Sequence, residues 1–318
     1  MIWLIGAGQM AIDYAKVLLA QKRNFLVIGR GENSAKTFQD KTGISVNTGG
    51  LKKWLSQTSE KPTSAIVAVN VNTLAETTSQ LLNYGVSKIL LEKPGGVNNK
   101  EISDLNNQSL ELNGEIYIAY NRRFYASTLT AQEIIMKDGG VTSFNFEFTE
   151  WSHVIENIGY PNEVMQQWFL VNSSHVVNLA FFLGGRPKSW LAYTSGSLPW
   201  HSIASNFAGA GVSECGALFS YQANWEAPGR WGVEILTRKH RLYFRPMEKL
   251  QMQEKGTIKV NPAEIDYTID TEYKPGLYLQ TECFFEFGKH KNNLCSLAEH
   301  CNSLKIYTKI VNPSTENV

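Results

Sequence analysis

The chain has 318 residues, enough for two domains, and its hydrophobic fraction of 43% and charged fraction of 19% are those of an ordinary globular protein. Its formal net charge of +1 predicts neither a nucleic-acid-binding surface nor an acidic tail. No apolar run approaches the ~20 residues that span a bilayer, and we expect no secretory leader because the first predicted strand begins at residue 2.

The N-terminal stretch combines a short apolar run, a glycine-rich turn and a helical pattern. Residues 2–5 read IWLI, residues 6–11 read GAGQMA, and apolar side chains then recur at helical spacing. Strand, tight turn and helix in this order are typical of the βαβ unit that binds dinucleotides. Gly6 would permit the turn, Gly8 would let the backbone approach a pyrophosphate, and Ala11 would let the helix pack against the strand. We expect cofactor contacts from Gly6, Gly8, Gln9 and Met10.

A second apolar run, residues 25–28, predicts a strand that ends at a Gly-Arg-Gly step. Units of this kind that prefer NAD usually carry an acidic residue there, which binds the ribose 2′-hydroxyl. Here Arg30 follows the strand, and Arg30 with Asn33 and Ser34 could bind a 2′-phosphate through charge and hydrogen bonds. The alternative is that Arg30 is a solvated loop residue and that Glu32 binds the ribose. We favour NADP(H) over NAD(H), with Arg30 and Ser34 as cofactor contacts.

Continuous apolar runs at residues 65–69 and 88–91 predict two further strands of a sheet that is covered on both faces. Residues 73–84 have the pattern of the helix between them, and residues 115–119 predict a fifth strand. The run at 88–91 leads into Glu92-Lys93-Pro94, and the fifth strand leads into residues 120–124, YNRRF. Both segments leave the carboxyl ends of parallel strands, where open α/β sheets bind ligands.

The second half of the chain changes to an alternating apolar and polar pattern, first at residues 141–150. Residues 163–183 contain a predicted helix. Further expected elements are strands at 189–194 and 214–223, a hairpin at 232–244 and helices at 277–287 and 294–310, with disorder only at the last six residues. The predicted fold is α/β. A Rossmann NAD(P)-binding domain at 1–121 is followed at 122–318 by a substrate-binding and oligomerisation α+β domain with a mostly antiparallel open sheet.

These motifs resemble the glucose–fructose oxidoreductase, inositol dehydrogenase and MocA (Gfo/Idh/MocA) family of NAD(P)-dependent oxidoreductases. The resemblance rests on GAGQMA, on LLEKPGG, on NRRF after the fifth strand, and on Ser174-His175 opening a helix that ends Leu-Gly-Gly. It implies that Lys93 meets both cofactor and substrate and that His175 completes the catalytic site. It also implies that Glu92 lies beside the cofactor, that the Lys93-Pro94 bond is cis, and that the antiparallel sheet forms a homo-oligomer.

Two positions depart from the family pattern. The family usually carries an aspartate four residues before the histidine, and this chain has Val171 there, with Asn172 beside it. The threonine-proline step that is common after the third strand is Asn70-Val71 here. The first departure removes a carboxylate that the family's acid–base relay usually contains, which puts that relay in doubt. The second leaves Asn70 as an altered cofactor contact.

Hydride transfer to or from a carbinol needs a group that moves the hydroxyl proton. Lys93 can do this if burial and nearby positive charge lower its pKa, and Arg122 and Arg123 would supply that charge. The alternatives are that Lys93 is a surface charge and that His175 is only a structural residue. We expect substrate contacts from Arg122, Arg123, Asn172 and Trp168, although most tryptophans of the second half would be core or interface residues.

The four cysteines lie in the second half without a C-x-x-C pair, which predicts reduced thiols in a cytoplasmic protein. No cluster has zinc-ligand spacing, so we expect no metal. The sequence favours an NADP(H)-dependent oxidoreductase that acts on a sugar, nucleotide-sugar or polyol, without nucleic-acid or membrane partners. Two alternatives stay open: a catalytically weakened dinucleotide-binding sensor or regulator, and a reductase for a non-sugar carbonyl.

Overall fold

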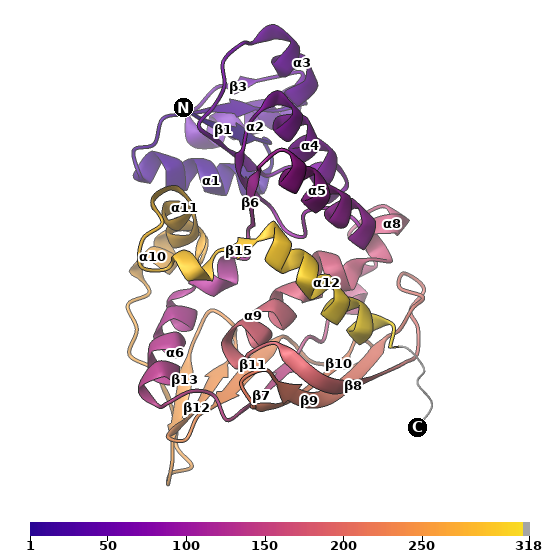
Figure 1. The fold of residues 1–318 in the computed structure, drawn as a ribbon, viewed down its shortest axis with the longest axis vertical. Coiled ribbons are helices and arrows are strands. Elements are labelled where there is room, and N and C mark those ends of the chain that lie inside the picture. Colours follow the sequence, from indigo (N-terminus) through magenta and orange to yellow (C-terminus); the bar gives the residue numbers. More distant parts are fainter. Residues whose placement is uncertain (314–318) are drawn as a thin grey trace. The chain divides into compact units, whose positions relative to one another are not determined.

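The computed structural model describes residues 1–313, and the chain divides into two compact units (Figure 1). Unit 1 comprises Met1–Phe124 and Thr268–Cys301, and unit 2 comprises Tyr125–Tyr267 and the residues from Asn302 onward. The division predicted at 121/122 lies near the first crossing but does not include the return of the chain to unit 1 at Thr268. The disorder expected at the last six residues lies, apart from Pro313, outside the described residues.

Unit 1 is built on a seven-stranded sheet in the order β15-β6-β5-β4-β1-β2-β3, parallel except for β15. The predicted parallel sheet is therefore confirmed. The strands are β1 (Ile2–Ile5), β2 (Phe25–Ile28), β3 (Val46–Asn47), β4 (Ser64–Val67), β5 (Lys88–Leu91), β6 (Glu115–Ile118) and β15 (Cys295–Ser296). The short strands β3 and β15 have no counterpart in the sequence prediction, because two residues are too few to show a period.

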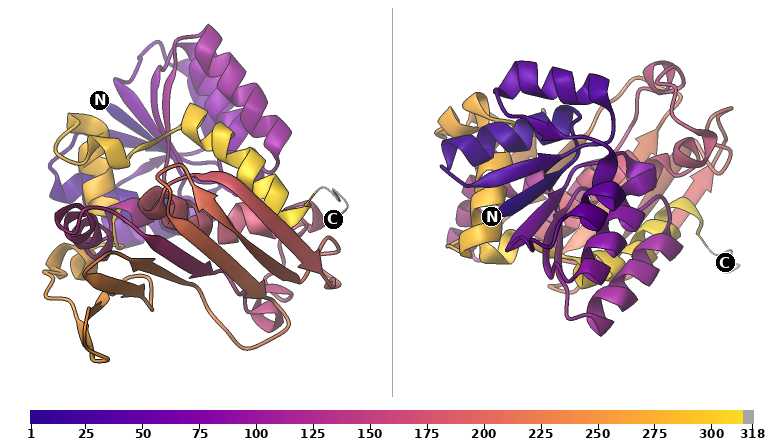
Figure 2. Two further views of the ribbon diagram at one scale, coloured as in Figure 1. Left: turned by 60° about the horizontal axis from the view of Figure 1, so that its bottom comes forward. Right: turned by 90° about the horizontal axis from the view of Figure 1, so that it is seen from above.

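Helices cover both faces of this sheet, as the continuous apolar strands require. They are α1 (Gln9–Ala20), α2 (Glu32–Thr42), α3 (Gly50–Gln57), α4 (Leu74–Tyr84), α5 (Asn99–Glu111), α10 (Thr268–Glu272) and α11 (Leu277–Glu286). In the right-hand view of Figure 2, the indigo helices lie on one side of the strands and the purple helices on the other. The buried side of α1 and the residues around Leu277 and Phe284 of α11 belong to one hydrophobic core.

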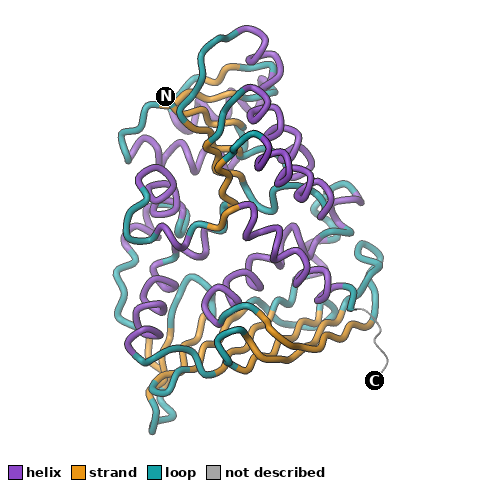
Figure 3. Tube along the Cα trace, viewed as in Figure 1, coloured by secondary structure: helices purple, strands orange, loops and turns teal. Residues whose placement is uncertain are grey.

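Unit 2 is built on an eight-stranded sheet in the order β14-β13-β12-β11-β7-β10-β9-β8. Only β7 and β10 pair in parallel among its neighbours, which confirms the predicted mostly antiparallel sheet. The strands are β7 (Ser143–Glu147), β8 (Pro187–Ser195), β9 (Asn206–Ser213), β10 (Leu218–Asn224), β11 (Gly232–Leu236), β12 (His240–Phe244), β13 (Gln251–Glu254) and β14 (Val260–Pro262). They form the continuous orange layer at the bottom of Figure 3.

One face of the second sheet is apolar and packs against α9. Phe144 and Phe146 of β7 contact the ring of Phe181 of α9 with centroids 6.0 and 5.3 Å apart. Along β10, buried and exposed residues alternate strictly, as a sheet covered on one side predicts. The other helices of the second half are α6 (Ala126–Lys137), α7 (Ser152–Ile155), α8 (Asn162–Met165), α9 (Ser174–Gly184) and α12 (Leu297–Val311), of which α12 crosses the unit boundary.

In the second half, one predicted strand has the wrong start and one strand was not predicted. The strand expected at 214–223 begins only at Leu218, because Gly216 has a φ of +85° and forms a turn. Strand β9 was missed because its glycines and alanines give no apolar alternation. Gly209 is needed there, since a Cβ would lie 2.4 Å from the ring of Tyr221. The helix predicted within 163–183, which carries His175, is α9, and it directly follows a π-helical segment, Phe169–Ser173.

Among residues 1–313, no helix is long and apolar enough to cross a membrane, and no group of three or more His, Cys, Asp or Glu side chains is arranged to hold a metal ion. None of the four cysteines is joined in a disulfide.

Candidate functional site

The glycine turn after β1 can be formed only by a residue without a side chain. Gly6 has a φ of +126°, and its amide donates a hydrogen bond to the carbonyl of Ile28 at 2.8 Å. A Cβ at Gly6 would lie 2.2 Å from the carbonyl oxygen of Ala68. The turn therefore stays tight against the neighbouring strand β4, as the motif requires.

Gly8 precedes α1 with an extended backbone, and no side chain caps the helix. A Cβ at Gly8 would meet nothing within 4 Å, so the space in front of the first helical turn is open. The first turn carries no acidic residue, and its backbone N–H groups have no intrahelical partners. Ala11 is fully buried and lets α1 lie against the sheet. Open space and uncapped N–H groups fit a pyrophosphate at this helix end.

Two lysines that are distant in sequence lie beside the first turn of α1. The Nζ atom of Lys274 is in contact with Sδ of Met10, and it lies 3.8 Å from a carboxylate oxygen of Asp13. Lys41 donates to the side-chain carbonyl of Gln9 at 3.4 Å. These positive charges would favour an anion at the helix end. Neither lysine was predicted, because Lys41 is 32 residues from Gln9 and Lys274 is 264 residues from Met10 in the chain.

The residues expected to contact the cofactor lie at one edge of the parallel sheet. Gly6, Arg30, Asn70 and Lys93 follow β1, β2, β4 and β5 respectively. Parallel strands end at the same edge, so the structure brings these four segments together within unit 1.

Arg30 is exposed and forms no ion pair within the described part of the chain. Ser34 is also exposed, and its hydroxyl donates to the carbonyl of Gly31 at 2.9 Å, which leaves its oxygen able to accept. Glu32 begins α2 in the same loop. Asn70 is exposed and precedes a short 3₁₀ turn, with its carbonyl accepting from the Thr73 amide.

Glu92 is held by a buried tyrosine of the first helix. The hydroxyl of Tyr14 donates to Oε1 of Glu92 at 2.8 Å. Burial raises the pKa of Glu92, while the Tyr14 hydrogen bond and the charge of Lys93 oppose this shift. Burial and the Glu92 charge raise the pKa of Tyr14, which stays a neutral donor. The sequence did not indicate this pairing.

Lys93 is half-buried and directly follows Glu92, and the Lys93-Pro94 peptide bond is cis, as predicted. A fully buried histidine of α12 holds this turn. Nε2 of His300 lies 2.9 Å from the carbonyl oxygen of Pro94, and Nδ1 lies 3.3 Å from the hydroxyl of Tyr120. Since a carbonyl only accepts, Nε2 carries the proton and Nδ1 accepts from Tyr120. Burial lowers the pKa of His300 to about 4, so the ring is neutral.

Arg122 and Arg123 have different environments. Arg122 is half-buried in the 3₁₀ turn Asn121–Phe124. The side chain of Arg123 is only 3% exposed and donates to the carboxylate of Glu299 at 2.7 Å. Its charge already has a partner in unit 1, so the substrate contact that the sequence predicted for Arg123 is poorly supported. Arg122 remains the better placed of the two.

The segment before His175 is bound to a carboxylate that sequence reasoning missed. In the π-helical segment Phe169–Ser173, Nδ2 of Asn172 donates to both oxygens of Glu150 at 3.0 and 3.2 Å. The hydroxyl of Ser173 donates to Oε1 of the same residue at 2.6 Å. Glu150 follows β7, twenty or more residues earlier in the chain. The predicted strand at 141–150 placed it at the end of an alternating pattern, where a glutamate would ordinarily face water.

Glu150 is almost completely buried, with its side chain 1% exposed. Nη1 of Arg230 lies 3.8 Å from Oε2, and the Arg230 guanidinium also lies over the rings of Trp151 and Trp231. Burial raises the pKa of Glu150 to about 7, against the lowering effects of the Ser173 hydrogen bond and the Arg230 charge.

His175 is the second residue of α9, is 7% exposed, and has its ring centroid 6.4 Å from that of Trp231. Val171 is buried in the preceding π-helical segment. Trp168 is 5% exposed and packs against the rings of Tyr160 and Trp200. Trp168 therefore lies in an aromatic core, and the substrate contact expected of it is less well supported than that of Asn172.

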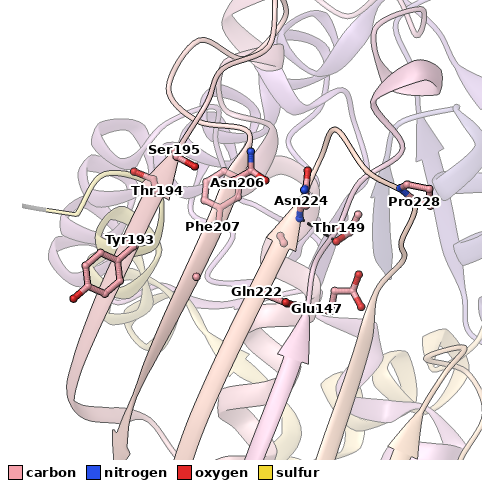
Figure 4. A pocket seen from close by; sticks show the side chains of 12 residues that line it. Glu147, Thr149, Tyr193, Thr194, Ser195, Asn206, Phe207, Gln222, Asn224 and Pro228 are labelled. Atoms are coloured by element: carbon pink, nitrogen blue, oxygen red, sulfur yellow. Dashed lines mark hydrogen bonds between the residues drawn. The ribbon is translucent and has the colours of Figure 1, made fainter.

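A separate hollow of about 420 Å³ lies on unit 2, over strands β7, β8, β9 and β10 (Figure 4). Polar side chains from neighbouring strands, among them those of Glu147 and Gln222, line this hollow. None of the residues predicted from the sequence lines this hollow.

Solved structures share the fold of this chain over nearly its whole length. An oxidoreductase from Agrobacterium radiobacter, in complex with NAD+, L-tartaric acid and magnesium, matches with a TM-score of 0.79 and 11% identity over 99% of this chain and 96% of that chain. Levoglucosan dehydrogenase with NADH and L-sorbose gives 0.77 and 16% identity over 99% and 96%. UDP-N-acetylglucosamine 3-dehydrogenase from Acidithiobacillus ferrooxidans gives 0.72 and 13% identity over 98% and 96%.

The chain has the fold of these oxidoreductases. They are of the Gfo/Idh/MocA type that the sequence resembles, so the expected resemblance is confirmed at the level of the fold. No protein-family model and no curated protein matches the sequence. Because the identities are low, activity and substrate are argued from the residues of this chain.

Proposed function

We propose that this chain is an NADP(H)-dependent oxidoreductase that transfers a hydride to or from a carbinol or carbonyl carbon of a sugar, nucleotide-sugar or polyol. The observation that carries the proposal is the turn before α1. The carbonyl oxygen of Ala68 leaves no room for a side chain at Gly6, whereas Gly8 faces open space at a helix end that no side chain caps. This is the cradle that a dinucleotide pyrophosphate needs. The fold that the chain shares with sugar and nucleotide-sugar dehydrogenases supports the substrate class.

The preference for NADP(H) rests on Arg30. Its exposed guanidinium follows β2 at the sheet edge, and Ser34 lies one helical turn further on with an accessible hydroxyl. A guanidinium binds a phosphate through charge-assisted hydrogen bonds, whereas NAD offers only a ribose hydroxyl at that point. Two of the structural neighbours are described with NAD+ or NADH. They support a nicotinamide dinucleotide, and the 2′-phosphate preference is inferred from this chain alone.

Lys93 is the residue that we propose moves the hydroxyl proton. It leaves the carboxyl end of β5 at the same sheet edge as Gly6, and its turn is fixed by Glu92, Tyr14 and His300. A fixed turn holds the ammonium in a narrow range of positions, which general acid–base catalysis requires. The bound nicotinamide would supply or accept the hydride. As the neutral amine, Lys93 would take the proton from the carbinol during oxidation, and as the ammonium it would return the proton during reduction.

His175 is proposed to assist Lys93, and Asn172 and Arg122 to bind the substrate. Asn172 already donates its amide to Glu150, which fixes the side chain and leaves its carbonyl oxygen as an acceptor. Trp168 and Arg123, which the sequence also predicted as substrate contacts, would act by supporting the fold around the site.

A dinucleotide-binding sensor without turnover is the second candidate. The observation that favours it is Val171, a buried apolar residue where the family usually has an aspartate. A reductase for a non-sugar carbonyl fits the same architecture. The deciding experiment combines NADPH binding, followed by protein fluorescence, with turnover of a panel of sugars, nucleotide-sugars, polyols and simple ketones. Binding with turnover of a sugar-like substrate is the expected result, and binding without any turnover would favour the sensor.

We further propose that the open face of the second sheet pairs with a second copy of this chain. Three large apolar side chains, Leu191, Tyr193 and Leu218, are 62%, 56% and 61% exposed on β8 and β10. Neighbouring exposed apolar residues mark interaction surfaces, and the family resemblance implies this partner. Leu191→Lys should shift the protein toward monomer in sedimentation velocity. Leu110→Lys is the control, at a similarly exposed leucine of unit 1. A wild-type protein that is monomeric at micromolar concentration would contradict the proposal.

A further inference from the structure

Glu150 is a buried carboxylate that the sequence analysis left without a role. Its side chain is 1% exposed, yet the residues around it are mostly neutral. Removing an ionised carboxylate from water costs several kcal/mol unless hydrogen bonds and charges replace the lost hydration. Two consecutive side chains donate to Glu150, Trp231 is a further hydrogen-bond partner that lowers its pKa, and one half-exposed arginine lies 3.8 Å away.

The donors of these hydrogen bonds show which segment of the chain Glu150 binds. Asn172 and Ser173 are the last two residues of the π-helical segment, and His175 follows two residues after Ser173. A π-helical segment is an uncommon backbone geometry that is frequent at functional sites. The three hydrogen bonds tie its end to Glu150, three residues beyond the end of β7, a strand in the middle of the sheet.

The other side of the same cluster also leads to His175. The Arg230 guanidinium lies near Oε2 of Glu150 and 4.6 Å from the centroid of the Trp231 ring. The Trp231 ring in turn lies beside the imidazole of His175, with centroids 6.4 Å apart. Glu150 therefore contacts both the backbone segment that carries His175 and the side chains that pack against its ring.

We propose that Glu150 is a positioning residue of the hydride-transfer site, which fixes the turn carrying His175 through Asn172 and Ser173. This inference rests on the proposed function. In the resembled family an aspartate one turn before the histidine is usual, and Val171 cannot serve in its place. Here a carboxylate from the end of β7 reaches the same turn from another part of the chain. Among the described residues, Arg230 is the charged side chain paired with it.

Burial raises the pKa of Glu150 to about 7, so its charge changes near neutral pH. This change of charge should alter the protonation of the His175 imidazole. We suggest measuring the titration of the His175 imidazole by NMR on histidine-labelled protein. The chain has six histidines, and the His175 signal is assigned by its loss in His175→Gln. The compared variants are Glu150→Gln, Glu150→Asp and Glu156→Gln, the last at an exposed glutamate of unit 2.

In Glu150→Gln, the His175 titration should lose its inflection near pH 7 and shift its midpoint by at least ~0.5 pH unit. Glu150→Asp should restore the inflection in part, and Glu156→Gln should match the wild-type protein. A Glu150→Gln protein with a native circular dichroism spectrum and an unchanged His175 titration would overturn the proposal. If Glu150→Gln does not fold, Ser173→Ala replaces it, with a smaller shift expected and an unchanged titration again overturning the proposal.

This measurement needs no substrate, so it separates the two proposals. If no compound on the panel is turned over, the proposed function fails, while the His175 titration still decides whether Glu150 acts on this turn. If a substrate is found, Glu150→Gln should lower kcat by about tenfold or more and leave the KM for NADPH unchanged, as loss of a supporting group does.

Discussion

The two glycines of the first turn should respond differently to the same added methyl group. Gly6→Ala places a Cβ 2.2 Å from the carbonyl oxygen of Ala68 in a residue with φ of +126°. The backbone strain costs about 1–2 kcal/mol and relieving the overlap about 1–3 kcal/mol more. We expect the free energy of unfolding to fall by roughly 2–5 kcal/mol.

Gly8→Ala adds the methyl group where nothing lies within 4 Å and where φ is −85°. Stability should change by less than about 0.5 kcal/mol, as for other substitutions without contacts. The methyl group would, however, occupy the space of the pyrophosphate, so NADPH affinity should fall at least ~tenfold. Gly43→Ala is the matched control for backbone strain, because Gly43 has φ of +74° and open space around its Cβ position.

Urea unfolding followed by circular dichroism gives the stability of each variant, and NADPH titration followed by protein fluorescence gives the affinity. Gly43→Ala should lose only about 1 kcal/mol, the cost of the φ angle without the overlap. The reasoning is refuted if Gly6→Ala is as stable as Gly43→Ala. Wild-type NADPH affinity in Gly8→Ala would show that the cofactor does not use this turn.

Three further outcomes are expected. Arg30→Ala should reduce the preference for NADPH over NADH about ten- to a hundredfold, measured by titrating both cofactors, and an unchanged preference would exclude Arg30 as the phosphate ligand. Lys93→Met should keep NADPH affinity but lower single-turnover hydride transfer by about 10²–10⁴, and His175→Ala should cost less because Glu150 binds the segment before His175, whereas position 171 offers no carboxylate to bind the ring directly. Parent-like turnover in Lys93→Met would favour the sensor. In Glu150→Gln, the free energy of unfolding should increase as pH is raised from 4.5 to 6.5. Urea unfolding at a series of pH values within this range measures it.

Local patterns were enough to predict the five longer parallel strands of the first unit. The apolar runs at β1, β4 and β5 are continuous because these strands are buried on both faces, and the glycine turn identified the first βα unit. The resemblance also predicted the cis Lys93-Pro94 bond correctly. The strand β9 could not be predicted in this way, because Gly209 and Gly211 are selected by close packing against β8 and β10 and not by alternation.

The partners of the site residues were beyond sequence reasoning because they are distant in the chain. His300 reaches Pro94 across 206 residues, and Lys274 reaches Met10 across 264. No local pattern indicates that a glutamate is buried, and in the sequence Glu150 is the polar end of a predicted strand. In the structure, Asn172 and Ser173 donate hydrogen bonds to it. A carboxylate missing at one position can thus be supplied from another element, and the loss of a motif residue does not by itself imply the loss of its physical effect.

Glu150 and His300 act on stability with opposite signs, although both are buried. For His300 the folded pKa of about 4 lies below the ordinary 6.5, so the unfolded chain binds the extra proton and stability is lost as pH falls from 6.5 to 4. For Glu150 the folded pKa of about 7 lies above the ordinary 4.5, so stability is lost as pH rises from 4.5 to 7. Each shift corresponds to about 3 kcal/mol. The two effects should nearly cancel between pH 4.5 and 6.5 in a single unfolding transition, and Glu150→Gln should expose the rise that His300 causes. A variant whose stability stays flat over this range would mean that His300 is not held neutral by its burial.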